Sequence, residues 1–142
     1  MTIYLTQIYV EAGANFPLSH HFQLLAGKLL TDAFCLPPPF VAKYGSDFAL
    51  VLRMSAKSSL QVVEIVGPTV FKRDKTVEFT IFIPFRKVPF DKTVFREVIT
   101  LLMEGINQVF IRIGVGNEEI TERLTLCAER ILSADNMRQE IR

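Results

Sequence analysis

The feature that most constrains the fold is the segment Thr76–Phe85, in which Val, Phe and Ile recur at every second position. A period of two places alternate side chains on opposite faces of a strand, so this segment predicts a strand with one face in a core. Phe82 adds a bulky residue to the other face. Two apolar faces are typical of a strand with neighbours on both sides, so we expect a central strand.

Two more strands are predicted before it, at Phe48–Met54 and Leu60–Val66. Gly67-Pro68 predicts a bend or bulge, after which Thr69–Lys72 continues the second of these strands. Arg73-Asp74 is then the turn of a hairpin. Because connections this short require antiparallel pairing, the three strands are expected to form an antiparallel meander.

Further elements flank the meander. Thr2–Val10 is rich in β-branched and aromatic residues and predicts an edge strand. Apolar residues recur at helical spacing across Phe16–Cys35, and the run Pro37–Pro39 stops that helix because proline cannot continue it. A second helix is predicted to begin at Asp91, whose carboxylate suits an N-cap.

The C-terminal part of the chain predicts one more strand and one more helix. Val109–Val115 favours a strand because Gly105 and Asn107 weaken a helix there. Asn117 is the predicted cap of a third helix, and the polar tail Asp135–Arg142 is expected to be frayed.

These elements predict an α+β protein with the order β-α-β-β-β-α-β-α, a mainly antiparallel sheet and helices packed on one face. A chain of 142 residues suits one domain over residues 1–142. It is large enough to bury a core without a disulfide or a metal ion.

Charge argues against nucleic acid as a partner. The chain has 16 Lys and Arg against 15 Asp and Glu, whereas nucleic-acid binders usually carry a strong basic excess. The basic residues near the strand Thr76–Phe85 stand at its two ends, roughly 33 Å apart, so they form no single patch.

The sequence also argues against export and membrane insertion. The first basic residue is Lys28, so the positive start of a signal peptide is missing. The early charge-free run Ala12–Gly27 is too short and too polar to span a bilayer. We expect a cytoplasmic protein without a membrane partner.

Residues that often hold metals or nucleotides are poorly placed. His20 and His21 are adjacent and their side chains diverge on a helix, so they are poorly placed to coordinate the same metal ion. Cys35 and Cys127 show no CxxC spacing and are predicted to be buried thiols of a reducing compartment. Gly114–Asn117 lacks the third glycine of a dinucleotide loop and predicts a helix cap. No cofactor or metal is expected.

Three charged residues lie inside predicted strands and permit two interpretations. Arg53, Glu64 and Glu78 would approach one another on a sheet face, and two carboxylates beside an arginine are able to act in acid–base chemistry. The same residues are also typical of the solvated face of an antiparallel sheet.

One combination of segments favours protein recognition. In the meander, the start of the strand Phe48–Met54 and the hairpin turn lie at the same end of the sheet, which brings the loop Pro37–Ser46 close to the turn. Aromatic side chains beside basic ones on loops are typical of a protein-recognition surface. The predicted partner-binding residues are Phe40, Tyr44, Lys72, Arg73 and Lys75.

Two protein families resemble parts of this pattern. The leucine pairs at 24–25 and 29–30 and the proline run after Leu36, followed by three strands and a helix, resemble the opening of type III secretion chaperones. Those are small homodimeric α+β proteins that hold effector segments. This chain departs from them in its N-terminal strand, and it has too few residues between the second and third helices for their last strand pair.

In size, α+β composition, its 12 Phe residues and the absence of catalytic motifs, the chain also resembles immunity proteins of bacterial polymorphic toxin systems. The resemblance implies a protein that binds and blocks one cognate toxin domain and catalyses nothing. It carries no motif from which residues are transferred.

The sequence therefore favours a non-enzymatic protein-binding module, first of all an immunity-type inhibitor of a toxin. A chaperone-like homodimer is the alternative of the same class. A small-ligand-binding protein or enzyme, with a pocket between sheet and helices, is the alternative of another class. A deep polar-lined cavity between sheet and helices favours the last, whereas a solid core with a flat aromatic end favours the first.

Overall fold

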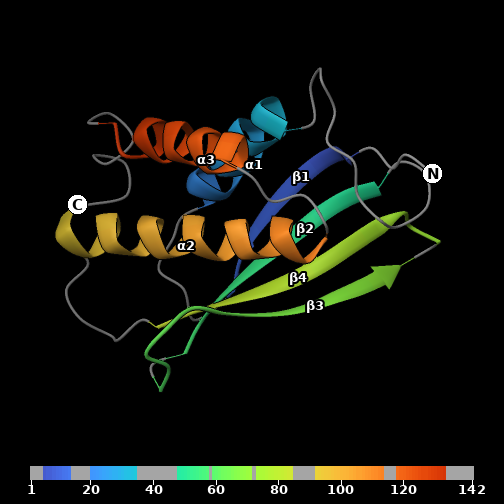
Figure 1. Cartoon of the computed structure of the whole chain (residues 1–142), viewed down its shortest axis with the longest axis horizontal. Coiled ribbons are helices and arrows are strands. Elements are labelled where there is room, and N and C mark those ends of the chain that lie inside the picture. The colour runs from blue at the N-terminus through green and yellow to red at the C-terminus, as the bar shows by residue number, and fades with distance from the viewer. Residues whose placement is uncertain are drawn as a thin grey trace.

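The computed structural model describes residues 5–13, 20–34, 48–57, 59–71, 73–84, 92–113 and 118–133. Figure 1 shows these as helices stacked on one side of a twisted sheet. The elements in chain order are β1 (Leu5–Ala12), α1 (His20–Phe34), β2 (Phe48–Ala56), β3 (Glu64–Phe71), β4 (Thr76–Ile83), α2 (Lys92–Arg112) and α3 (Glu118–Ile131). The expected α+β fold is confirmed.

The described strands form a four-stranded sheet in the order β1-β2-β4-β3. The predicted edge position of the first strand and the central position of β4 are both confirmed. The sheet is mixed, because β3 and β4 are antiparallel whereas β1 pairs with β2, and β2 with β4, in parallel.

The predicted meander is therefore wrong in one pairing, since β2 lies beside β4 and not beside β3. The connection after β2 begins with Lys57, whose N–H donates to the Ile83 carbonyl at the end of β4 (3.0 Å). Two strand spacings amount to about 10 Å, which the residues between β2 and β3 span easily. The short connection from β2 to β3 therefore passes the end of β4, which lies between them.

The hairpin β3–β4 forms as predicted. Its register shifts between Val66 and Thr69, which confirms the bulge at Gly67-Pro68. Gly67 has φ 137°, a conformation that L side chains rarely adopt. Arg73 to Lys75 form the turn, and Lys75 adopts a left-handed φ of 53°.

The core lies between the sheet and the helices. α1 packs against β1, α2 packs against β4 and β3, and α3 packs on the other two helices. Phenylalanine pairs join α1 to α2: Phe22 meets Phe95 edge to face at 6.2 Å, and Phe34 meets Phe110 at 4.7 Å between ring centroids. Among the described residues, every buried side chain is hydrophobic.

The strand expected at Val109–Val115 is not formed, because α2 continues through Arg112. Val109, Phe110 and Ile113 are buried at helical spacing, so the apolar stripe of the helix extends to its end. A Cβ atom placed on Gly105 would lie 2.5 Å from Ile81 Cγ2. The glycine marks a close approach of helix and sheet and not the end of the helix.

Several predictions lie outside the described residues: the caps at Asn117 and Asp91, Cys35, and the tail Asp135–Arg142. None of the helices that the structure describes has both the length and the apolarity needed to cross a bilayer.

Candidate functional site

The face of the sheet that no described helix covers presents the second set of alternating side chains, and we call it the open face. Three of its large apolar side chains are strongly exposed: Tyr9 on β1 at 49%, and Val66 and Phe71 on β3 at 57% and 40%. They belong to the two outer strands. Val66 and Phe71 share β3, whereas Tyr9 lies at the other side of the face, with β2 and β4 between them.

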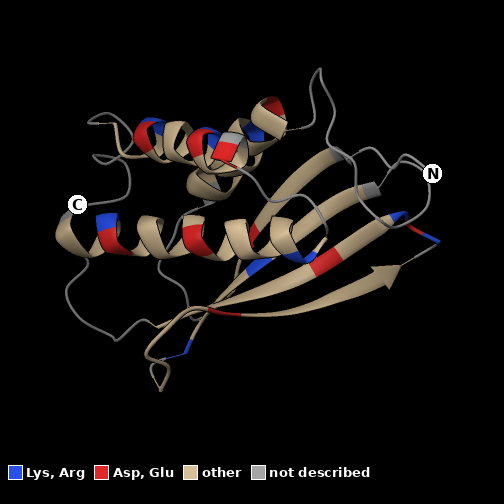
Figure 2. Cartoon of the chain, in the orientation of Figure 1, with Lys and Arg blue, Asp and Glu red and all other residues tan. Residues whose placement is uncertain are grey.

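A charged cluster occupies the middle of the open face. Arg53 on β2 donates to the carboxylate of Glu78 on β4 (3.1 Å) and lies 3.6 Å from the carboxylate of Glu11 on β1. Figure 2 shows the basic segment of β2 between the acidic segments of the neighbouring strands. The pairs are partly exposed, so each contributes little to stability and serves mainly to order the face.

The structure brings together two of the three charged residues singled out from the sequence. Arg53 and Glu78 are in contact, whereas Glu64 lies opposite Phe82 and forms no ion pair within the described part of the chain. Glu11 was missed, because only the parallel pairing of β1 with β2 places it opposite Arg53. The side chains of Arg53 and Glu11 are about half exposed and that of Glu78 is 23% exposed, which suits the solvated-face interpretation.

The outer edge of β1 is closed by α1. The Ile8 N–H donates to Thr31 Oγ1 (3.0 Å), which lies 3.1 Å from the Ile8 carbonyl and 2.7 Å from the Gly27 carbonyl. A Cβ atom on Gly27 would be 3.2 Å from the Ile8 oxygen and 3.6 Å from the Val10 nitrogen. The helix backbone therefore lies directly against the strand edge.

Replacing Thr31 with valine is expected to lower the free energy of unfolding by about 1.5 kcal/mol. The isosteric methyl group removes the partner of two partly buried backbone groups of Ile8 and leaves them unsatisfied. Urea denaturation measures the loss. Thr125→Val on α3 is the matched control, because the hydroxyl of Thr125 makes an exposed hydrogen bond to the Thr121 carbonyl. The free energy of unfolding of this variant should be close to that of the wild type. Equal losses for both variants would contradict the role of Thr31.

The outer edge of β3 is closed in another way. Arg112 at the end of α2 donates from Nη1 to the carbonyls of Ile65 and Gly67, at 3.4 and 3.3 Å. The bulge at Gly67-Pro68 also breaks the edge into two short runs. Main-chain pairing with a partner strand is thus obstructed along β1 and at the Ile65 and Gly67 carbonyls of β3.

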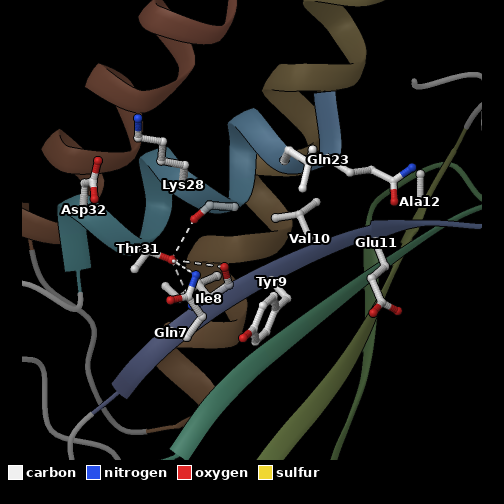
Figure 3. A pocket seen from close by; sticks show the side chains of 12 residues that line it. Gln7, Ile8, Tyr9, Val10, Glu11, Ala12, Gln23, Lys28, Thr31 and Asp32 are labelled. Atoms are coloured by element: carbon white, nitrogen blue, oxygen red, sulfur yellow. Dashed lines mark hydrogen bonds between the residues drawn. The ribbon is translucent and has the colours of Figure 1, made fainter. Parts of the chain in front are cut away.

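A groove of about 690 Å³ runs along α1 and β1 and is lined by residues of both. Figure 3 shows Lys28, Thr31 and Asp32 on the helix side, with Tyr9 and Glu11 on the opposite side of the strand. Because Tyr9 belongs to both, the groove is continuous with the open face.

The predicted partner-binding residues are only partly described. Arg73 and Lys75 are exposed on the hairpin turn, whereas Phe40, Tyr44 and Lys72 lie outside the described residues. The Ala49 N–H donates to the Lys75 carbonyl (2.9 Å), so the start of β2 does lie beside the turn. The parallel pairing of β2 with β4, and not a meander, produces this proximity.

The residues considered for metal or thiol chemistry are placed as follows. His21 is exposed, and the side chain of His20 lies outside the described residues. Among the described residues, no three His, Cys, Asp or Glu side chains are grouped to hold a metal ion. Cys127 is a buried free thiol between α3 and α1, with Sγ 3.7 Å from the Leu29 carbonyl.

Burial raises the pKa of the Cys127 thiol above its ordinary 9.0; Arg130 opposes this shift and Asp32 adds to it. The folded state therefore holds the thiol proton more tightly than the unfolded state. The free energy of unfolding is expected to fall as the pH rises above about 9, where the unfolded thiol ionises first. Comparing the wild type with Cys127→Ala between about pH 8 and pH 10 tests this, because the variant should lose less stability over that range. Parallel curves for the two proteins would contradict it.

Comparison with models of protein families, with curated proteins and with solved structures gives no match.

Proposed function

We propose that the protein is a non-enzymatic binding module that covers a partner protein with the open face of its sheet. The observation that carries the proposal is the exposure of Tyr9, Val66 and Phe71 on one face of the sheet, on strands whose edges are occupied at Ile8 and at Ile65 and Gly67. A face held by four strands changes shape little on binding, so little conformational entropy is lost in the complex.

The packing of the described core supports binding over catalysis. Its buried side chains are all hydrophobic, so polar side chains gather outside this core, among them those of the groove along α1 and the edge of β1. Arg53 forms ion pairs with Glu78 and Glu11 on the surface of the sheet, outside this core. These features suit a surface that recognises another surface.

Within this class, we propose an immunity-type inhibitor of a cognate bacterial toxin. Such an inhibitor acts by covering its target and requires a stable, preformed surface more than it requires reactive groups. The test in cells is expression of the product of the neighbouring gene with and without this chain. Growth restored by this chain supports the proposal, whereas toxicity that is unaffected by it contradicts the immunity role.

The binding surface is tested by a pair of matched double variants. Tyr9→Ser with Val66→Ser is expected to weaken binding of the partner at least about tenfold, equivalent to about 1.4 kcal/mol. Ile111→Ser with Leu126→Ser on the helices is the control, since these residues are exposed to a similar extent, 58% and 60%. Calorimetric titration measures affinity, and both variants should melt close to the wild type because exposed sites contribute little.

Loss of binding in the helix variant with retention in the sheet variant would move the site to the helical layer. A third variant, Arg73→Glu, tests the turn that the sequence predicted. If the turn belongs to the same surface, this variant changes the affinity for the partner without changing the melting temperature.

A further inference from the structure

Each outer strand of the open face carries an exposed carboxylate two residues from an exposed apolar side chain. On β1 the pair is Glu11 and Tyr9, and on β3 it is Glu64 and Val66. Residues two apart on a strand share a face and lie about 7 Å from each other. The open face therefore has the same combination of charge and apolar surface at both of its sides.

This combination suits one kind of side chain. Lys and Arg lay their aliphatic stems along apolar surface and extend the charged group to a polar partner. Tyr9 also offers an aromatic ring that attracts a cation. Both pairs thus have the chemistry to hold a basic side chain, its stem on Tyr9 or Val66 and its charge on Glu11 or Glu64.

The charges on the open face also favour a basic partner. The four strands contain three carboxylates (Glu11, Glu64 and Glu78) and one guanidinium, that of Arg53, which contacts Glu11 and Glu78. Lys57 lies at one end with its ammonium over the Phe82 ring, 5.5 Å from the centroid, and forms no described ion pair with Glu64. Glu64 forms no ion pair within the described part of the chain, and Glu11 shares the single charge of Arg53 with Glu78, so both outer strands keep negative charge for a partner.

The two pairs lie roughly 15 Å apart, because three strand spacings and an offset of two residues separate Glu11 from Glu64. No small cation spans that distance. A phosphate backbone is repelled by this sign of charge, and two copies of this chain would oppose acidic face to acidic face. A protein surface with two basic side chains at matching spacing satisfies both pairs.

We infer that the open face recognises a basic protein surface through two lysine or arginine side chains, one held by Glu11 and Tyr9 and the other by Glu64 and Val66. This inference rests on the proposed function and specifies the chemistry of the partner. It does not require that the partner be a toxin.

The probe is the peptide Arg-Ser-Thr-Ser-Arg, whose arginines are about 13 Å apart when extended. Titration into isotopically labelled protein, followed by nuclear magnetic resonance, should shift the amides of Tyr9, Glu11, Glu64 and Val66 at about 20 mM salt. Screening should abolish the shifts at about 300 mM salt. The variant with Glu11→Gln and Glu64→Gln should bind the peptide about threefold to tenfold more weakly.

Glu104→Gln with Glu122→Gln changes the net charge equally on the exposed helical layer and should leave binding of the peptide intact. The inference is overturned if no shifts occur, if the shifts spread over α3, if both double variants weaken binding alike, or if Glu-Ser-Thr-Ser-Glu binds as well. A natural partner that depends on Tyr9 and Val66 but not on Glu11 and Glu64 would overturn this inference and leave the proposed function standing.

Discussion

Replacing Phe79 with alanine is expected to lower the free energy of unfolding by about 3–5 kcal/mol. Phe79 lies on the central strand β4, is 1% exposed and is among the largest fully buried side chains. The substitution removes a whole ring from the contact between sheet and helices, and its neighbours on β2 and β3 are fixed by the sheet and are poorly able to collapse into the space. Chemical denaturation with an unchanged m-value is the measurement.

Phe71→Ala is the matched control for this prediction. It removes the same ring from the same hairpin, but at a position on the open face that is 40% exposed. This variant should lower the free energy of unfolding by less than about 1 kcal/mol. A cost below 1 kcal/mol for Phe79→Ala, or equal costs for the two variants, would show that the buried face of β4 has been assigned wrongly.

Replacing Gly105 with alanine is expected to destabilise the protein by about 2 kcal/mol, although the same change stabilises an ordinary helix by about 1 kcal/mol. The new methyl group would lie 2.5 Å from Ile81 Cγ2 and 3.1 Å from Val63 Cγ1. These atoms belong to branched side chains that are themselves buried, so a shift of either one disturbs the packed core. The sign of the effect therefore reports how closely α2 approaches the sheet.

A double-mutant cycle with Ile81→Ala separates the steric effect from helix propensity. In the Ile81→Ala background the clashing Cγ2 is absent, so Gly105→Ala should be neutral or stabilising there. Additive effects in the cycle would mean that the two residues do not meet.

Elements with a strong repeating pattern were predicted well from the sequence. The alternation in β4, the bulge at Gly67-Pro68 and the turn at Arg73-Asp74 depend on local geometry, and the structure reproduces them. The pairing of β2 was not predictable in this way, because a connection of a few residues reaches a strand one or two positions away. The continuation of α2 was missed because Gly105 was interpreted by its helix propensity, whereas its role is set by contact with Ile81.

The candidate site was predicted less well, for a related reason. Arg53 and Glu78 were found because they interrupt apolar strands, but their neighbour Glu11 follows from the register of two parallel strands. The exposure of Val66 depends on which strand becomes the outer one. Alternation identifies two faces of each strand, and only the order of the strands decides which side chains remain in solvent.

The closed edges of the sheet have a consequence for the protein at high concentration. An exposed strand edge acts as a template for other chains and leads to fibrils. Thr31 and the α1 backbone at Gly27 shield β1, and Arg112 with the bulge shields β3. We expect Arg112→Ala to lower the folding stability slightly and to shorten the lag time of fibril formation, because it uncovers the Ile65 and Gly67 carbonyls at the edge of β3.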